Sequence, residues 1–393
     1  MSGGREFLMA DEIPEGWKEC RLGDIADINM GQSPKSENYN DFGEGLPFLQ
    51  GNRTFGSRYP LIDTYCTNPK KIANEGEILF SVRAPVGDIN IANRKICIGR
   101  GLASFNAKNQ QNLFLFYLLH FIKGDIINSE SGTVYGSVNK NDLKSVPILL
   151  PPLPEQRAIA SVLSSLDDKI DLLHRQNKTL EAIAETLFRQ WFVDCDYSCT
   201  ISDLIEIQNG YAFKSKDFKD VGVNGVIKIK NISENIVDIY NCDFIEESVA
   251  NQTDSRFVIK TGDILIAMTG AKIGKMGIVP QTERKLWLNQ RVGLLKEKYN
   301  GSRFLAYLQL KSDYGQDYID NTATGSAQPN ISGIGIENCE FPKITEKQIK
   351  EYSEKLLCLY EKVIFNLGQI RTLEKLRDTL LPKLMSGEVR VRV

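Results

Sequence analysis

Several short stretches of the chain combine basic and amide side chains with glycine, serine or threonine. In the first half, their polar members are Gln32, Lys35, Gln50, Asn52, Arg53, Arg83, Thr133, Tyr135 and Ser137. In the second half, they are Lys214, Lys216, Lys228, Lys230, Asn231, Thr269, Lys272, Lys275, Ser326, Gln328 and Asn330. Arg, Lys, Asn and Gln can hydrogen-bond the edges of nucleic-acid bases, whereas hydroxyl and backbone N–H groups hold phosphates. These residues are therefore candidates for DNA contact, although each stretch alone is also an ordinary surface loop.

The overall charge limits how such contacts could work. The formal net charge is −2 and the pI is about 6.0, whereas a small protein that holds DNA by bulk charge is usually far more basic. The basic residues must therefore be grouped on one face, or a partner must supply much of the attraction to phosphate. Among the candidates we favour Arg53 and Arg83 in the first half, and Lys230 and Lys272 in the second.

Residues that could run catalysis are scarce. His120 lies in an apolar segment and His174 in a long charged one, so neither of the two histidines is placed as a general base. Residues 269–276 resemble a phosphate-binding loop, but only three residues separate the glycines, and Met276 replaces the hydroxyl that binds Mg²⁺. The Asn-Pro-Pro-Tyr or Asp-Pro-Pro-Tyr tetrapeptide of amino-methyltransferases is absent. We therefore expect no catalytic residues in this chain.

Cysteine usage and hydropathy indicate the compartment. The eight cysteines are scattered and no C-x-x-C pair occurs, so we expect reduced thiols and no bound metal. No run of about 18 apolar residues occurs, and residues 1–10 lack the apolar core of a signal peptide. We therefore expect a cytoplasmic protein without a membrane span.

The chain is internally duplicated. Three pairs of segments match at offsets of 179, 186 and 193, namely 20–31 with 199–210, 75–80 with 261–266, and 176–187 with 369–380. Because the order of features stays the same while the offset grows, the second copy carries loop insertions.

Each copy is predicted to hold one compact domain followed by one long helix. Short apolar runs such as 78–82 and 264–268 predict buried strands, and residues 111–122 predict a helix, so the domains are of the α+β class. We place the domains at residues 11–150 and 195–342, and the long helices at 151–193 and 343–387.

The long helices carry apolar residues at alternating spacings of three and four, which is typical of a coiled-coil seam. The predicted seam positions are Leu163, Leu166, Ile170, Leu173, Leu180, Ala184, Leu187 and Trp191 in the first helix, and Leu356, Leu359, Val363, Ile370, Leu373 and Leu380 in the second. Because the second helix starts where the second domain ends, it must run back along the first. This predicts an antiparallel pair with approximate two-fold symmetry, although a buried pair inside one globule is the alternative.

Two asparagines suggest the register of this pair. Asn177 and Asn366 each occupy a seam position, and a buried Asn pair fixes register at some cost in stability. If the two asparagines face each other, Leu166 faces Arg377. That mismatch is tolerable if the stem of the arginine packs and its guanidinium reaches water.

Four motifs frame this layout. They are Ile13-Pro14-Glu15-Gly16-Trp17 before Leu22-Gly23-Asp24, Pro151-Pro152-Leu153-Pro154-Glu155-Gln156 before the first long helix, Phe188-Arg189-Gln190-Trp191-Phe192 at its end, and the closing residues 380–388. Together with the duplication, they resemble the specificity subunit of type I restriction-modification systems over nearly the whole chain. The second copy departs from the pattern, because residues 343–348 lack the full proline run and no Pro-Glu-Gly-Trp opens the second domain.

The resemblance implies two target-recognition domains, each reading one half of a split site on double-stranded DNA, with the helices setting the gap. It also implies two methylation subunits that bind S-adenosylmethionine, and restriction subunits that use ATP and Mg²⁺ for translocation and cleavage. No cofactor is then expected on this chain itself. The near-neutral charge agrees, because partners can supply phosphate contacts.

Two other functions stay open at this point. A pure assembly scaffold would join proteins through its coiled coil without binding DNA, and fluorescence anisotropy with mixed-sequence DNA would identify it. A self-contained methyltransferase or nuclease is disfavoured by the missing motifs, and binding of S-adenosylmethionine by the isolated chain would revive it.

Overall fold

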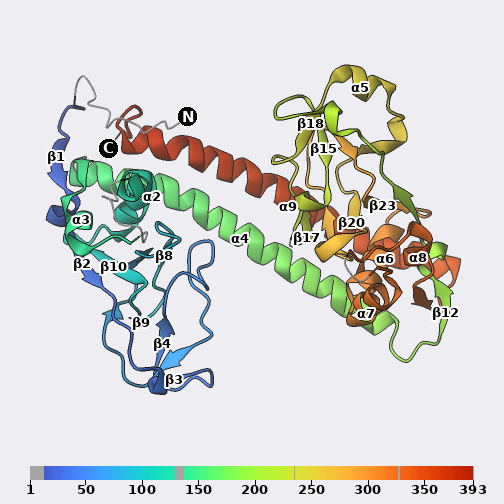
Figure 1. The fold of residues 1–393 in the computed structure, drawn as a ribbon, viewed down its shortest axis with the longest axis horizontal. Helices are drawn as coiled ribbons and strands as arrows, with labels where there is room; N and C mark the ends of the chain where they lie inside the picture. The colour runs from blue at the N-terminus through green and yellow to red at the C-terminus, as the bar shows by residue number, and fades with distance from the viewer. Residues whose placement is uncertain (1–12, 129–136, 234, 326–327, 393) are drawn as a thin grey trace. The chain divides into compact units, whose positions relative to one another are not determined.

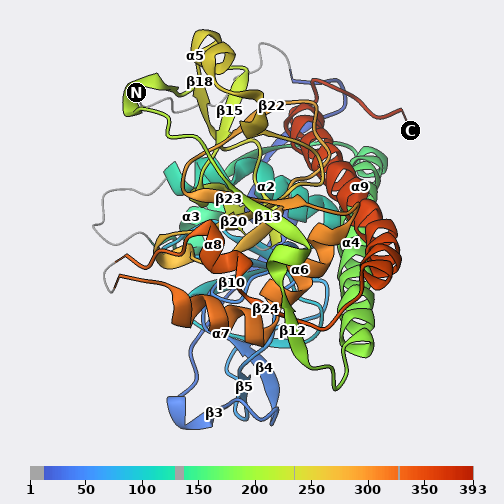
Figure 2. The same cartoon turned by 90° about the vertical axis from the view of Figure 1, so that its right-hand side faces the viewer.

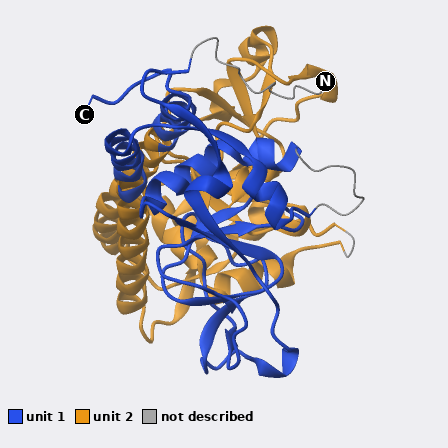
Figure 3. Cartoon of the chain, turned by 90° about the vertical axis from the view of Figure 1, so that its left-hand side faces the viewer, with its two compact units in different colours: residues 1–168, 374–393 blue, residues 169–373 orange. Residues whose placement is uncertain are grey.

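The computed structural model describes residues 13–128, 137–233, 235–325 and 328–392 (Figure 1). The chain divides into two compact units, unit 1 with residues 1–168 and 374–393, and unit 2 with residues 169–373 (Figure 3). The units therefore divide within the two long helices rather than at the helix ends.

Unit 1 combines short strands with a few helices. Its strands are β1 (Lys18–Arg21), β2 (Ala26–Met30), β3 (Tyr39–Asn40), β4 (Leu46–Leu49), β5 (Tyr65–Cys66), β6 (Ile72–Ala73), β7 (Ile78–Ser81), β8 (Ile89–Ile91), β9 (Ile96–Ile98), β10 (Leu102–Ala107) and β11 (Pro147–Leu150). Its helices are α1 (Leu22–Ile25), α2 (Asn112–Asn128), α3 (Lys140–Ser145), the first part of α4 (Leu153–Trp191) and the end of α9 (Glu346–Met385).

Unit 2 has the same kind of composition. Its strands are β12 (Tyr197–Thr200), β13 (Ile205–Asn209), β14 (Phe218–Lys219), β15 (Asn224–Ile227), β16 (Ile232–Ser233), β17 (Asn235–Val237), β18 (Asp243–Ile245), β19 (Val258–Ile259), β20 (Ile264–Ala267), β21 (Met276–Ile278), β22 (Lys285–Leu288), β23 (Val292–Glu297) and β24 (Glu340–Pro342). Its helices are the second part of α4, α5 (Glu247–Gln252), α6 (Ser302–Lys311), α7 (Asp313–Thr322), α8 (Gly333–Glu337) and most of α9 (Glu346–Met385).

The two units repeat one sheet topology, which confirms the duplication. Unit 1 has a sheet of order β2-β10-β7-β8 and another of order β3-β5-β4-β9-β6, and in unit 2 the orders are β13-β23-β20-β21 and β14-β18-β15-β22-β19. In both copies the second sheet contains one parallel pair, β4 with β9 and β15 with β22. Unit 2 adds β17 and β16 to its first sheet, and α5 lies between β18 and β19, where the offset between the copies grows.

Helices cover the first sheet of each unit and build its main core. In unit 1, α2 packs on this sheet through the buried side chains of residues Phe114 to Leu119. In unit 2, α6 takes this place and packs against β13 and β23 (Figure 2). The start of α4 and the end of α9 complete the core of unit 1, through residues such as Leu163 and Leu384.

Within unit 2, α4 and α9 pair antiparallel in the predicted register. The Nδ2 of Asn366 donates to the Oδ1 of Asn177 at 2.8 Å, and both side chains are buried. Ile170, Leu173 and Ile370 form an apolar cluster beside this amide pair. Among the described residues, Asn177 Nδ2 and Asn366 Oδ1 have no hydrogen-bond partner, so the pair gives register at a cost in stability.

At two predicted seam positions the following residue is more buried than the seam leucine. Leu166 and Leu187 are only partly buried, whereas the neighbouring Asp167 and Phe188 are buried. Phe188 faces inward because it packs against Phe341 in the core of unit 2.

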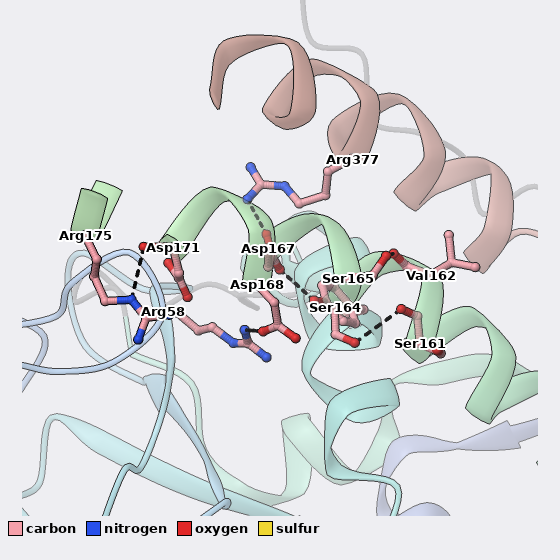
Figure 4. A network of polar contacts seen from close by, with 11 residues as sticks. Arg58, Ser161, Val162, Ser164, Ser165, Asp167, Asp168, Asp171, Arg175 and Arg377 are labelled. Atoms are coloured by element: carbon pink, nitrogen blue, oxygen red, sulfur yellow. Dashed lines mark hydrogen bonds and ion pairs between the residues drawn. The ribbon is translucent and has the colours of Figure 1, made fainter. Parts of the chain in front are cut away.

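Asp167 is buried because it organises a polar network in unit 1 (Figure 4). It accepts hydrogen bonds from Tyr117 Oη at 2.6 Å and Arg377 Nη1 at 2.8 Å. Burial works to lower the pKa of Arg377, but its bonds to Asp167 and Asp378 raise it overall. The guanidinium of Arg377 therefore binds two carboxylates, and its side chain is still 32% exposed.

The adjacent Asp168 holds the long loop between β4 and β5. Arg58, which is buried in this loop, donates from Nη1 to Asp168 Oδ1 at 2.5 Å. The amide of Asn90 fixes the same loop, since its Oδ1 accepts from Gly56 N–H and its Nδ2 donates to Gly56 O. The loop is thereby held to α4 and to β8.

No helix in the described part of the chain is long and apolar enough to cross a membrane. All eight cysteines are free thiols in the structure.

The Asn pair can be tested by substitution. Asn366→Leu leaves the amide of Asn177 buried without a partner, so it should lower the free energy of unfolding by about 1–3 kcal/mol. The double variant Asn177→Leu with Asn366→Leu should be at least as stable as the parent, because it replaces both polar groups with apolar ones. Urea denaturation followed by helical circular dichroism measures both. A double variant as unstable as the single one would contradict this account of the pair.

Candidate nucleic-acid interface

Four chain segments of unit 1 meet where β2, β4, β7 and β9 end. We call residues 31–32, 49–50, 82–83 and 99–101 the unit 1 junction. Four backbone hydrogen bonds of 2.8–3.0 Å hold the junction together. They run from Gly31 N–H to Leu102 O, from Gln32 N–H to Ile98 O, from Gly99 N–H to Leu49 O, and from Val82 N–H to Gly101 O. Because these bonds join different strands, the backbone of the junction is held in a single arrangement.

Unit 2 repeats these four bonds. We call residues 210–211, 227–228, 268–269 and 289–291 the unit 2 junction. Its four backbone hydrogen bonds, of 2.8–3.2 Å, run from Gly210 N–H to Val292 O, from Tyr211 N–H to Leu288 O, from Asn289 N–H to Ile227 O, and from Met268 N–H to Arg291 O. The matching bonds make Gln32 equivalent to Tyr211, Gln50 to Lys228, Arg83 to Thr269, and Arg100 to Gln290.

Glycine is required at one point of each junction. A Cβ on Gly31 would lie 2.1 Å from the carbonyl oxygen of Gly99, and a Cβ on Gly210 would lie 2.2 Å from that of Asn289. No side chain fits at such distances, so the close crossing of two backbones explains why the first matched segment ends in glycine in both copies.

A fifth segment joins each junction. Arg83 forms a β-bridge with Ser137, and Thr269 forms the equivalent bridge with Asn330. Of the predicted residues, the structure therefore brings together Gln32, Gln50, Arg83 and Ser137 in unit 1, and Lys228, Thr269 and Asn330 in unit 2.

Several predicted cations already have protein partners. Arg53 donates to Asp63 at 2.7 Å, and Lys228 and Lys230 both contact Asp243 at 2.6 Å. Burial works to raise the pKa of Asp243, but the hydrogen bonds from the two lysines lower it overall. Lys272 donates to the carbonyls of Lys230 and Ile232, and Lys35 lies 3.5 Å from Glu37. Three of the four favoured residues, Arg53, Lys230 and Lys272, are therefore engaged within the protein.

Three amide side chains support the loops. Asn231 is a correction to the predicted set, because its side chain is buried, accepts from Lys228 N–H and donates to Asn241 O. Asn52 donates to Asp88 Oδ2 at 2.5 Å. Gln50 exchanges hydrogen bonds with Ser33 at 2.9 and 3.0 Å, which fixes the turn after β2.

Most of the remaining predicted residues are exposed, and three lie outside the part of the chain that the structure describes. Arg83, Lys214, Lys216 and Lys275 are exposed, and none has a side-chain partner within the described ranges. Gln32, Gln328 and Asn330 are also exposed. Thr133, Tyr135 and Ser326 lie outside the described residues.

Sequence reasoning missed three exposed residues of the junctions, namely Arg100, Gln290 and Arg291. Arg100 lies between Gly99 and Gly101, a pattern that the loop survey could have included. Gln290 and Arg291 have no flanking glycine, so only alignment of the two copies through their strands would have identified them.

The structure also shows the surroundings of the two histidines and of the groups that could bind a metal. His120 is half-buried in α2, where burial and the nearby charges of Lys123 and Arg377 lower its pKa to about 4. It is therefore neutral near pH 7, and its aromatic partner is Phe116. His174 lies on α4 with its side chain exposed. Within the described residues, no group of three or more His, Cys, Asp or Glu side chains could hold a metal ion.

The repeated fold matches one family of proteins. The family model for the type I restriction modification DNA specificity domain matches the chain twice, over residues 14–182 and 197–352. The chain belongs to this family. The two matched regions correspond to the two copies of the sheet topology, so the type I specificity subunit resemblance seen in the sequence is confirmed.

Individual relatives agree with the family. The type I restriction enzyme MjaVIII specificity subunit of Methanocaldococcus jannaschii is 25% identical over 409 residues, which cover 97% of this chain and 94% of that protein. A second protein of that organism, described as a MjaX specificity subunit, is 47% identical over 174 residues, but the match spans only 43% of this chain and 41% of the relative. The crystal structure of a type I S subunit from M. genitalium has the same fold, with a TM-score of 0.64, 17% identity, and coverage of 94% and 96%.

The exposed and the paired arginines of unit 1 can be compared directly. Arg83→Ala should weaken DNA binding by the assembled complex. If Arg83 reads a base, the loss should be about 1–3 kcal/mol at one base pair, and if it holds a phosphate, all sequences should weaken alike and the salt slope should fall by about one. Arg53→Ala is the matched control and should have a smaller effect, because Asp63 already holds that guanidinium. Fluorescence anisotropy at several salt concentrations measures both variants. A large loss for Arg53→Ala beside none for Arg83→Ala would reverse the assignment.

Proposed function

We propose that this chain is the sequence-reading subunit of a type I restriction-modification complex. It binds a split target on double-stranded DNA, with unit 1 reading one half and unit 2 the other, and it directs methylation and restriction subunits to that target. The observation that carries this proposal is the repetition of one junction, with the same backbone bonds, in two units of one chain.

Differences between the junctions support separate reading by each unit. The backbone positions are equivalent, yet Arg83 is replaced by Thr269 and Gln32 by Tyr211. Two junctions with the same protein backbone but different side chains are suited to binding two different DNA sequences in the same orientation. Contacts to the DNA phosphates position the duplex, whereas side chains that contact base edges specify the sequence.

The long helices connect the two readers and, in this proposal, also set the distance between the half-sites. α4 has 39 residues and α9 has 40, so each is roughly 60 Å long at about 1.5 Å per residue. Asn177 and Asn366 fix how the two helices pair in unit 2.

In this proposal, the partner subunits carry out the chemical reactions. Two methylation subunits bind S-adenosylmethionine and transfer the methyl group, and restriction subunits use ATP and Mg²⁺. This chain contributes no catalytic residue and no cofactor, and acts in the cytoplasm where its partners and DNA are found. A chain that bound no DNA even in the presence of a methylation subunit would instead be an assembly scaffold.

Exchange of one domain tests modular reading. Replacing residues 199–340 with the second domain of another specificity subunit should change one half of the methylated target and leave the other half intact, because the unit 1 junction is untouched. The reciprocal exchange of residues 18–150 is the control and should change the opposite half. Methylation mapping of the host genome identifies the target, and a simultaneous change of both halves would reject modular reading.

Insertion into the helices tests their role as a spacer. Seven residues added to both α4 and α9 keep the seam in phase and lengthen each helix by about 10 Å at roughly 1.5 Å per residue. Since DNA rises about 3.4 Å per base pair, the unread gap should grow by up to about three base pairs. Seven residues inserted between α4 and β12 form the control, because that loop lies outside the paired helices. A gap that stays the same in the helix variant would show that the helices do not set it.

A further inference from the structure

Arg100 and Gln290 occupy the same place in the two junctions. Each lies in the turn that joins the last strand of a parallel pair to the next strand, between β9 and β10 in unit 1 and between β22 and β23 in unit 2. The residue before each donates its N–H to the end of the parallel partner strand, Gly99 to Leu49 and Asn289 to Ile227. The residue after each accepts from the segment that follows the central strand β7 or β20.

The backbone at both positions is held by the segment that follows β2 or β13. Arg100 N–H donates to Ser33 Oγ at 3.2 Å, and Gln290 N–H donates to Tyr211 O at 2.9 Å. The crossings at Gly31 and Gly210 bring the backbone of the same segment against Gly99 and Asn289, the residues that precede Arg100 and Gln290.

Both side chains are exposed and uncommitted. Neither Arg100 nor Gln290 has a side-chain hydrogen bond or ion pair with any part of the protein that the structure describes. This distinguishes Arg100 from Arg53, which Asp63 holds, and from the lysines that share Asp243. Neither side chain therefore has to break an internal ion pair before it contacts DNA.

The two side chain types match different bases. The guanidinium of arginine donates two hydrogen bonds to O6 and N7 of guanine, whereas the amide of glutamine donates to N7 and accepts from N6 of adenine. The equivalent positions therefore carry two different kinds of base-reading group, one in each unit.

We propose that Arg100 and Gln290 are corresponding specificity-determining residues, with Arg100 reading a guanine in one half-site and Gln290 reading an adenine in the other. This inference rests on the proposed function and deepens it, since it names one base-reading position in each half of the target.

Reciprocal substitution tests the proposal in the assembled complex of this chain with its methylation subunits. Arg100→Gln should change the preferred base at one base pair of one half-site from guanine towards adenine, and Gln290→Arg should make the opposite change in the other half-site. Discrimination at that base pair should move by about 5- to 150-fold, which corresponds to the 1–3 kcal/mol of a bidentate base contact. Competition binding with duplexes that differ from the target at single base pairs measures these changes.

Two further variants sharpen the test. Arg94→Gln is the matched control, because Arg94 is an exposed arginine of the same unit that lies in the turn before β9, outside the junction, and it should leave every preference unchanged. Arg100→Lys keeps the charge but not the forked geometry, so it should lose discrimination at the same base pair that Arg100→Gln alters.

The outcomes separate this inference from the proposed function. If the parent complex binds no split target, the proposed function fails. If it binds one, and Arg100→Gln and Gln290→Arg leave the base preferences unchanged or weaken all duplexes alike, the two residues are not base readers and the inference is overturned. A shift confined to one base pair in the expected half-site for each variant supports it.

Discussion

No side chain fits where the backbones of residues 31 and 210 cross their neighbouring segments, and the arrangement of each polar surface depends on this constraint. A Cβ would lie 2.1 Å from a carbonyl oxygen at residue 31 and 2.2 Å from one at residue 210, so glycine lets four strand ends converge and exchange backbone hydrogen bonds. Once they converge, side chains far apart in the sequence, such as Gln32, Arg83 and Arg100, are presented from one rigid framework. The same framework in unit 2 presents Tyr211, Thr269 and Gln290, so specificity can diverge while the framework is retained.

The long helices are subject to a different constraint, since they must pair in a single register along a narrow seam. In unit 2 the buried Asn177–Asn366 pair favours one register, and in unit 1 Asp167 binds both Tyr117 and Arg377. These polar contacts contribute less to stability than apolar residues of similar size could, since each buried polar group must be desolvated. Their value is that a shifted register leaves buried polar groups unpaired, which is more costly than losing an apolar contact.

Periodicity and duplication made much of the fold predictable from sequence. The two long helices, their antiparallel register and the repetition of the domain follow from spacings that tolerate local variation. The burial of Asp167 and Phe188 beside the seam leucines was not predictable, because their partners Tyr117 and Phe341 come from distant segments, which no helical pattern contains. The same reason limited the site. Asn231 looks like an exposed loop residue until its two backbone partners are known, and Lys230 looks free until Asp243 is placed beside it. Gln290 was missed because its position is defined by bonds between strands rather than by its neighbours in sequence.

The central claim is that one chain reads both halves of a split DNA target with two copies of the same framework. The most direct measurement is methylome sequencing of a host that expresses this chain with its methylation subunits, compared with a host that expresses the methylation subunits alone. The account predicts methylation at one target made of two specified halves and an unspecified gap, present only when this chain is expressed. Methylation of a continuous target, or of the same sites in both hosts, would contradict it.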